Sequence, residues 1–251
     1  MDPLLNDYRV VSGADAPLAW PTLAGRSDPP LRPIPEAVGD GAEVERSRPV
    51  LCRGFASLPE APGLFAELLQ AEPEIFGYTK SAVENDDDGA WLTIPGAAAW
   101  AQFQTRALKI NILDSRCSGA ERLLAGWRAK AWAQPSFVSW VLTVAPKLTY
   151  FHVDPPYGGN FMFLCRGRKT WLVIPPDAMA TIEQRHGFKT VNVLPLPELL
   201  RLDDGFLWGQ ILLGELRAGD LLYFPDGWAH FVRTTEDCIG YGGYFGSAPA
   251  S

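Results

Sequence analysis

Short apolar runs separated by turn residues fill the second half of the chain, after about residue 137. The runs cover residues 138–144, 160–165, 170–174, 221–224 and 231–232. Runs of this length, bounded by glycine, proline and charged residues, predict β-strands. The sequence Arg166-Gly167-Arg168 is expected to form a tight turn between two strands. Helical segments are expected at about 177–185 and 197–202, between the strands.

The first half of the chain has a different texture. Residues 12–47 are rich in proline, glycine, aspartate and arginine, a composition that disfavours long regular elements. We therefore expect an extended or partly disordered arm over residues 1–47. A short strand is expected at 49–52, and helices where apolar residues recur at helical spacing near 64–69, 100–103 and 123–127.

Together these elements predict a mainly β fold with flanking helices. Many short strands with a single helical insertion are typical of a double-sheet jelly roll, also called a double-stranded β-helix. We expect one domain over residues 48–251, with the β-helix core at about 138–245.

Composition narrows the function classes. The chain has 251 residues, 47% of them hydrophobic, and a formal net charge of −7. This is enough apolar material for a sizeable core, and the negative charge argues against nucleic acid as a partner. No signal peptide or long apolar span occurs, so we expect a soluble, intracellular protein, cytoplasmic or nuclear, without a membrane partner. The four cysteines are scattered and predict reduced thiols.

Candidate metal ligands occur at two places in the strand-rich second half of the chain. His152 and Asp154 are separated by one residue, and His230 follows much later. On a β-strand, residues two apart face the same side, so an imidazole and a carboxylate can bind one ion. Two histidines and one carboxylate leave metal positions open, which is typical of non-haem Fe(II) oxygenases that bind a cosubstrate and O₂ together.

Three further side chains are candidates for binding a cosubstrate. Lys169 interrupts an apolar run, and a lysine inside a barrel requires an anion such as a dicarboxylate. The Thr149 hydroxyl and the Asn160 amide could hydrogen-bond to carboxylates. Each also has a simpler explanation: a solvated charge for Lys169, ordinary strand propensity for Thr149 and turn chemistry for Asn160. Trp171 and Trp228 could line the pocket, but large aromatic residues beside a barrel more often pack in the core, and they are interpreted as core residues.

These motifs resemble those of the JmjC-domain family, cupin-fold oxygenases that depend on Fe(II) and 2-oxoglutarate, and especially its small hydroxylases. The resemblance covers about residues 138–245. It is carried by Thr149-x-x-His152-x-Asp154, Asn160, Gly167-x-Lys169-x-Trp171, Pro175-Pro176, Gly219-Asp220, Tyr223-x-Pro225 and Trp228-x-His230. It implies that His152, Asp154 and His230 bind iron and are the catalytic centre. It also implies that Thr149 and Lys169 hold the distal carboxylate of 2-oxoglutarate, with Asn160 near its other end.

The chain also departs from the family pattern. Pro155, Pro156 and the Tyr157-Gly158-Gly159 stretch give an unusual path after the metal pair, and glycines at 240, 242 and 243 stand where many relatives carry a polar residue. No helices that could mediate dimerisation follow the final strand, so a monomer is expected.

The expected function is hydroxylation of a protein or peptide side chain, with O₂ and 2-oxoglutarate consumed and succinate and CO₂ released. Three alternatives stay open. The same chemistry serves small-molecule biosynthetic oxygenases and N-methyl-lysine demethylases, and a non-catalytic cupin-like binding protein is the remaining one.

Overall fold

The computed structural model describes residues 31–38, 47–55, 61–78, 91–112, 115–124, 135–154, 156–187 and 206–246. The strands are β1 (Arg32–Pro33), β2 (Glu36–Val38), β3 (Val50–Arg53), β4 (Ile75–Tyr78), β5 (Trp91–Ile94), β6 (Phe137–Thr143), β7 (Lys147–His152), β8 (Asn160–Ile174), β9 (Leu212–Arg217), β10 (Leu221–Phe224) and β11 (Ala229–Tyr244). The helices are α2 (Ala61–Ala71), α3 (Gly96–Gln104), α4 (Ala120–Leu123), α5 (Pro176–His186) and the 3₁₀ helix η1 (Trp208–Gln210).

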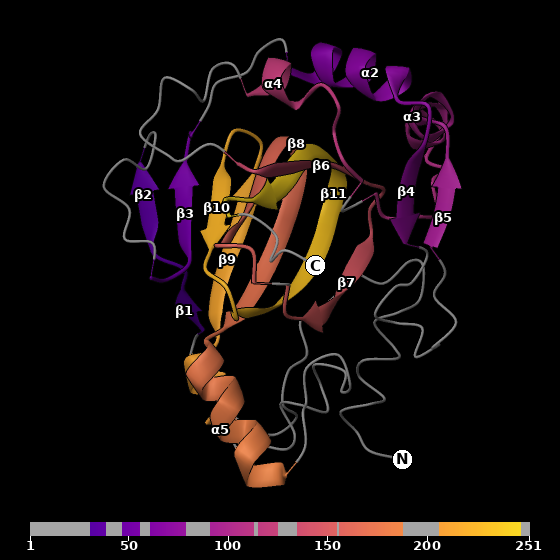
Figure 1. Cartoon of the computed structure of the whole chain (residues 1–251). Helices are drawn as coiled ribbons and strands as arrows, with labels where there is room; N and C mark the ends of the chain where they lie inside the picture. Colours follow the sequence, from indigo (N-terminus) through magenta and orange to yellow (C-terminus); the bar gives the residue numbers. More distant parts are fainter. Residues whose placement is uncertain are drawn as a thin grey trace.

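Two long antiparallel strands, β8 and β11, organise the domain (Figure 1). Their halves belong to two different layers. The start of β8 and the end of β11 lie between β10 and β6, with β3 and β2 continuing this first sheet. The end of β8 and the start of β11 lie between β9 and β7, with β1 at the edge of this second sheet. This arrangement is a jelly roll, and the predicted fold class is confirmed.

The strands change layer around Gly167. The sequence predicted a tight turn here, but β8 continues through Arg166, Gly167 and Arg168. Gly167 has φ 91°, and a Cβ at this position would lie 2.4 Å from the carbonyl oxygen of Asp237 on β11. A glycine is required because both long strands bend at this point in close contact. The predicted hairpin is therefore wrong, and the glycine marks a shared bend.

Helices cover the outer faces of both sheets. Phe65 of α2 packs edge-on against Trp140 of β6, with ring centroids 4.9 Å apart. On the opposite side, Met179 and Ile182 of α5 pack with Leu172 and Phe231. Figure 1 shows α2, α3 and α4 above the sheets and α5 below them. Helices α2, α3 and α5 lie where helices were predicted, whereas α4 shares only Leu123 with the helix predicted near 123–127. The predicted helix at 197–202 lies outside the described residues.

The segment from Arg32 to Val38 joins the two layers. β1 pairs in parallel with β9 of the second sheet, and β2 pairs in parallel with β3 of the first. Between them, Ile34 is 1% exposed and enters the core between the sheets. The described part of the predicted N-terminal arm is thus integrated into the domain edge.

Asp220 attaches β3 to the start of β10. Its carboxylate accepts hydrogen bonds from Gly54 N (3.0 Å), Arg217 N (3.2 Å) and the Arg53 guanidinium (2.6 Å). The Asp220 side chain is buried, so removing it takes a buried, charged acceptor away from all three donors. This network gives the Gly219-Asp220 motif a structural role.

Asp220→Ala is expected to lower the free energy of unfolding by roughly 3 kcal/mol, because it breaks a buried, charge-assisted network. Urea unfolding monitored by tryptophan fluorescence measures this change. Glu236→Ala is the control: it removes an ion pair to Arg168 between exposed side chains, which is worth about 1 kcal/mol or less. Equal losses in the two variants would contradict the assignment.

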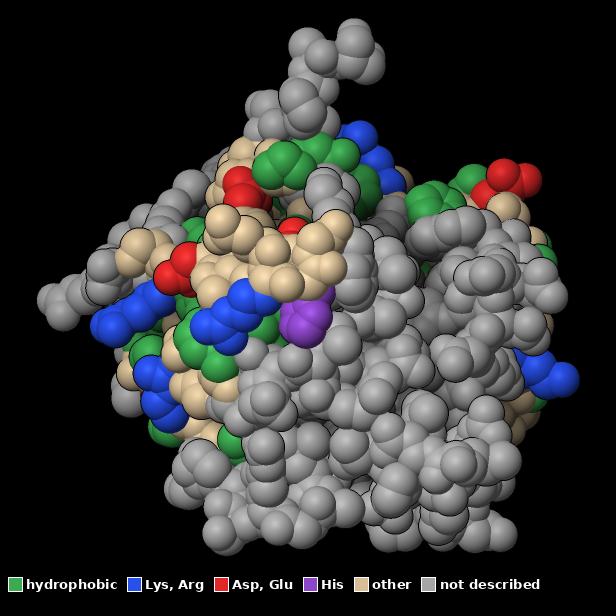
Figure 2. Space-filling model, turned by 90° about the horizontal axis from the view of Figure 1, so that it is seen from below, with side chains coloured by type: hydrophobic (Ala, Val, Ile, Leu, Met, Phe, Trp, Pro, Cys, Tyr) green, Lys and Arg blue, Asp and Glu red, His purple; other side chains and the backbone are tan. Residues whose placement is uncertain are grey.

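The described surface carries mixed charge. On the face that bears α5, acidic and basic side chains are interspersed with neutral and apolar ones, and the described residues form no broad basic patch there (Figure 2). Among the described helices, none combines the length and the apolar character that crossing a bilayer requires.

Candidate functional site

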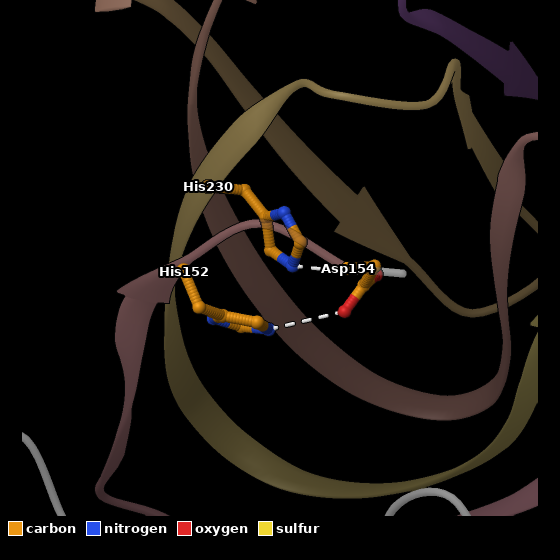
Figure 3. Close-up of side chains that lie close together, drawn as sticks. All are labelled: His152, Asp154 and His230. Atoms are coloured by element: carbon orange, nitrogen blue, oxygen red, sulfur yellow. Dashed lines mark ion pairs between the residues drawn. The ribbon is translucent and has the colours of Figure 1, made fainter. Parts of the chain in front are cut away.

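His152, Asp154 and His230 converge between the two sheets (Figure 3). One ligand atom from each lies within 4.8 Å of the others. Asp154 Oδ1 is 3.4 Å from His152 Nε2, and Asp154 Oδ2 is 3.7 Å from His230 Nε2. The three donors therefore face a common point, as a two-histidine, one-carboxylate metal site requires.

The β-ladder aligns the two histidines, but the carboxylate reaches the site differently. His152 is the last residue of β7 and is paired directly with His230 of β11. We expected His152 and Asp154 to share one face of a strand. The strand ends at His152, and Asp154 extends from the segment that follows.

Burial sets the protonation of these donors. His230 is 2% exposed, and its Nδ1 lies 3.2 Å from the Trp228 carbonyl oxygen. Nδ1–H is assigned as the donor, which leaves the Nε2 lone pair facing Asp154. Burial, helped by His152, lowers the pKa of His230 to about 4. Burial acts to raise the pKa of Asp154, but the two histidines outweigh it and hold that pKa below its usual value. A neutral imidazole beside an ionised carboxylate fits a divalent cation.

The metal-free protein is expected to lose stability as the pH falls from about 6.5 to 4. His230 binds a proton more readily in the unfolded chain, because its pKa in the folded protein is lowered to about 4. The resulting loss in the free energy of unfolding is negligible above pH 6.5 and reaches about 3 kcal/mol at pH 4. Urea unfolding with chelator, compared between wild type and His230→Gln, isolates the effect. Parallel pH profiles for the two proteins would contradict it, and His186→Gln is the control.

A cavity of about 70 Å³ adjoins the three ligands. Both sheets line it, including Ser139 and Val141 of β6, Met162 of β8 and Gly242 of β11. The three predicted cosubstrate contacts, Thr149, Asn160 and Lys169, also lie in its wall. The structure therefore brings all six predicted site residues to one place, while their roles stay predictions.

Among the described residues that line this cavity, Lys169 is the only lysine. Its side chain is 1% exposed, and its Nζ donates to Thr143 Oγ1 at 3.3 Å. Within the described part of the chain it has no carboxylate partner. Burial lowers the pKa of Lys169, although the nearby Cys238 thiol acts in the opposite direction. The alternative of a solvated charge is wrong, and the cavity contains a cationic group that lacks an anion.

Thr149 and Asn160 face the same space. Thr149 is three positions before His152, a spacing that normally points side chains to opposite faces. A register shift between His230 and Val232 on β11 lets both residues face inward. Asn160 is the first residue of β8 and is 3% exposed, and its Oδ1 has no hydrogen-bond partner among the described residues. A buried polar atom of this kind is typical of a ligand site.

Two residues beside the site were not among the predicted site residues. Trp171 is a core residue, as interpreted, and it also lines the cavity, with its ring centroid 5.3 Å from that of His230. Thr143, which accepts the hydrogen bond from Lys169 Nζ, was not identified, although Ser139, Val141 and Thr143 alternate along β6 and this period of two was a usable signal. Trp228 contributes through its backbone carbonyl, which accepts the His230 hydrogen bond.

The comparisons with known proteins point to one family. Residues 127–250 match the family described as the cupin-like domain. A JmjC domain-containing histone demethylation protein 1 from Yarrowia lipolytica is 32% identical over 107 residues, 42% of this chain and 20% of that protein. Its namesake from Caenorhabditis briggsae is 29% identical over 108 residues, 42% of this chain and 9% of that protein. The HSPB1-associated protein 1 homolog of Danio rerio is 30% identical over 92 residues, which are 34% of this chain and 20% of that protein.

The matched region thus spans a fifth or less of the length of these relatives. The region that matches the cupin-like domain, residues 127–250, contains β6 to β11, the three metal-ligand candidates and the cavity. The jelly roll, the match to the cupin-like domain and the JmjC relatives agree with one another. Residues 127–250 form a cupin-like domain, and part of the chain is similar to JmjC domain-containing proteins.

Proposed function

We propose that the protein is an Fe(II)- and 2-oxoglutarate-dependent oxygenase. The observation that carries this proposal is the shared cavity of the His152, Asp154, His230 cluster and the buried, anion-free Lys169. A metal site alone fits many functions. A buried ammonium beside it adds a requirement for a ligand that presents a carboxylate away from the metal.

Each side chain has a distinct task in this proposal. His152, Asp154 and His230 hold Fe(II) and leave positions open for the cosubstrate. Lys169 binds the distal carboxylate of 2-oxoglutarate, with hydroxyls from Thr143 and Thr149 nearby. Asn160 orients the other end. When bound, Fe(II) supplies the oxidation of 2-oxoglutarate by O₂ to succinate and CO₂, with the second oxygen atom entering a substrate C–H bond.

The rest of the wall limits competing reactions. Trp171 and Phe224 pack on the His230 ring, with centroids 5.3 Å and 4.8 Å away. These rings fix the imidazole and exclude water from that side of the site. Positioning of the C–H bond and protection from solvent are the protein's main contributions to this chemistry.

Hydroxylation of a protein or peptide side chain is the first candidate reaction. The names of two of the relatives favour a protein substrate and support the second candidate, demethylation of N-methyl-lysine. Both reactions insert oxygen into a C–H bond. On an N-methyl group, the hydroxymethyl product releases formaldehyde and leaves the amine.

Anaerobic loading with Fe(II) and 2-oxoglutarate, followed by exposure to air, tests the proposal. The reaction contains a peptide library, including methylated and unmethylated histone-tail peptides, and a metabolite mixture. Succinate is expected to form in wild type and to be lost in His152→Ala, with both proteins folded by circular dichroism. Gain of one oxygen on a peptide supports hydroxylation, and loss of a methyl group with formaldehyde supports demethylation.

Other products identify the remaining alternatives. Oxygen gain on a metabolite alone would assign a small-molecule oxygenase. Wild-type protein that binds a peptide but never consumes 2-oxoglutarate would contradict the oxygenase and support a non-catalytic binding protein.

A further inference from the structure

The Asp226 carboxylate binds two consecutive backbone N–H groups between Asp154 and Asn160. Gly158 N donates to Oδ2 at 2.9 Å, and Gly159 N donates to Oδ1 at 2.8 Å. Both glycines have left-handed backbone angles, with φ of 82° and 97°. Side chains with a Cβ rarely adopt these angles. Asp226 therefore fixes the conformation of this turn through both of its carboxylate oxygens.

The opposite side of the turn contacts the segment after β11. Gly246 N donates to Tyr157 O at 2.6 Å, and Phe245 N donates to Gly159 O at 3.1 Å. A Cβ at Gly158 would lie 2.9 Å from Gly246 Cα. The turn is thus closely packed between the Asp226 loop and the end of β11.

Asp154 depends on this turn more than the histidines do. His152 and His230 are aligned by strand pairing, whereas Asp154 lies beyond the end of β7. Gly158 follows Asp154 by four positions, and a chain of this length reaches at most about 14 Å. A fixed Gly158 therefore limits where the Asp154 carboxylate can lie.

Asp226 also belongs to the segment that leads into β11, four positions before His230. Its two hydrogen bonds join this segment to the one that follows Asp154. A charged acceptor makes each bond stronger than a neutral one. The carboxylate thus links the two chain segments that carry metal-ligand candidates.

We propose that Asp226 is a positioning residue of the metal centre, holding Asp154 and Asn160 in place through the turn at Gly158 and Gly159. This inference rests on the proposed function. Groups that orient metal ligands typically contribute about 10–100-fold to metal affinity. Asp226 is expected to contribute on this scale without contacting metal or cosubstrate.

Asp220 provides a matched comparison. It lies at the opposite end of β10, and its carboxylate likewise accepts two backbone N–H groups, from Gly54 and Arg217. Asp220 connects strands and contacts no segment that carries a metal-ligand candidate. Asp220, a structural carboxylate, and Asp226, the proposed positioning carboxylate, can therefore be compared at the two ends of β10.

The experiment titrates Mn²⁺ into metal-free wild type, Asp226→Ala, Asp226→Asn and Asp220→Asn, with urea unfolding measured on each. Asp226→Ala is expected to weaken Mn²⁺ binding 10–100-fold. Asp226→Asn is expected to fall between it and wild type, since the amide keeps one acceptor oxygen. Asp220→Asn is expected to lower stability while leaving Mn²⁺ affinity within about twofold of wild type. Hydrogen exchange at the Gly158 and Gly159 amides is expected to be faster in the two Asp226 variants than in wild type, and unchanged in Asp220→Asn.

The outcomes separate this inference from the proposed function. Wild-type protein without Mn²⁺ affinity would contradict the metal centre, and the positioning role would fail with it. If wild-type protein binds Mn²⁺ and both Asp226 variants bind it with the same affinity as wild type, the positioning role alone would be overturned. A loss of affinity in Asp220→Asn that matches Asp226→Asn would also overturn it, because the effect would then follow stability.

Discussion

Asp154→Ala is expected to lower Mn²⁺ affinity by more than about 100-fold and to abolish measurable succinate formation. The variant removes the only carboxylate of the cluster, whose oxygens lie 3.4 Å and 3.7 Å from the two histidine Nε2 atoms. Because residues that only orient ligands contribute about 10–100-fold, loss of a ligand itself has a larger effect. Metal titration and a succinate assay at saturating Fe(II) measure the two quantities.

The variant should still fold, because Asp154 lies outside the β-ladder. Circular dichroism and the urea midpoint without metal check this directly. His186→Ala is the matched control, since His186 is the last residue of α5 and outside the cavity lining. Mn²⁺ affinity retained in Asp154→Ala, or lost equally in His186→Ala, would rule out the assigned cluster.

Lys169→Met is expected to stabilise the ligand-free protein and to weaken 2-oxoglutarate binding by roughly 100-fold. Methionine fills a similar volume without a buried ammonium, so the ligand-free protein should gain about 1–3 kcal/mol. In the complex, the distal carboxylate loses its charged donor and becomes a buried, unpaired anion. Opposite signs for the two effects distinguish a ligand-binding lysine from a structural one.

Urea unfolding without ligand measures the first effect, and the KM for 2-oxoglutarate measures the second. Lys147→Met is the control, on β7 of the same sheet. Its Nζ donates to the Lys109 carbonyl oxygen at the surface, so little change in KM is expected. A destabilised Lys169→Met variant with a normal KM would show that the lysine stabilises the fold and does not bind the cosubstrate.

The sequence identified the residues that converge at the site better than it identified the structure around them. His152, Asp154 and His230 were found because few other functions require two histidines and a carboxylate in this order. Lys169 was found because a lysine within an apolar run needs a partner. Both predictions used only residue type and local spacing. Neither required knowledge of the strand register.

Strand register and the helices that cover the sheets explain why other residues near the site were not predicted. Six of the seven β6 residues are buried, because helices cover the outer face and the cavity lies behind the inner one. Burial therefore could not identify Thr143 as an inward-facing residue. Gly167 was assigned to a hairpin, because a bend shared by two long strands depends on β11, far away in the sequence. Asp220 and Asp226 act through backbone N–H groups from distant segments, which no local pattern reveals.

A crystal structure with Mn²⁺ and N-oxalylglycine, an unreactive analogue of 2-oxoglutarate, tests the central claim most directly. We expect Mn²⁺ bound to His152, Asp154 and His230, with the distal carboxylate of the analogue within hydrogen-bond distance of Lys169 Nζ. Metal bound at other residues, or an analogue whose distal carboxylate points away from Lys169, would contradict it.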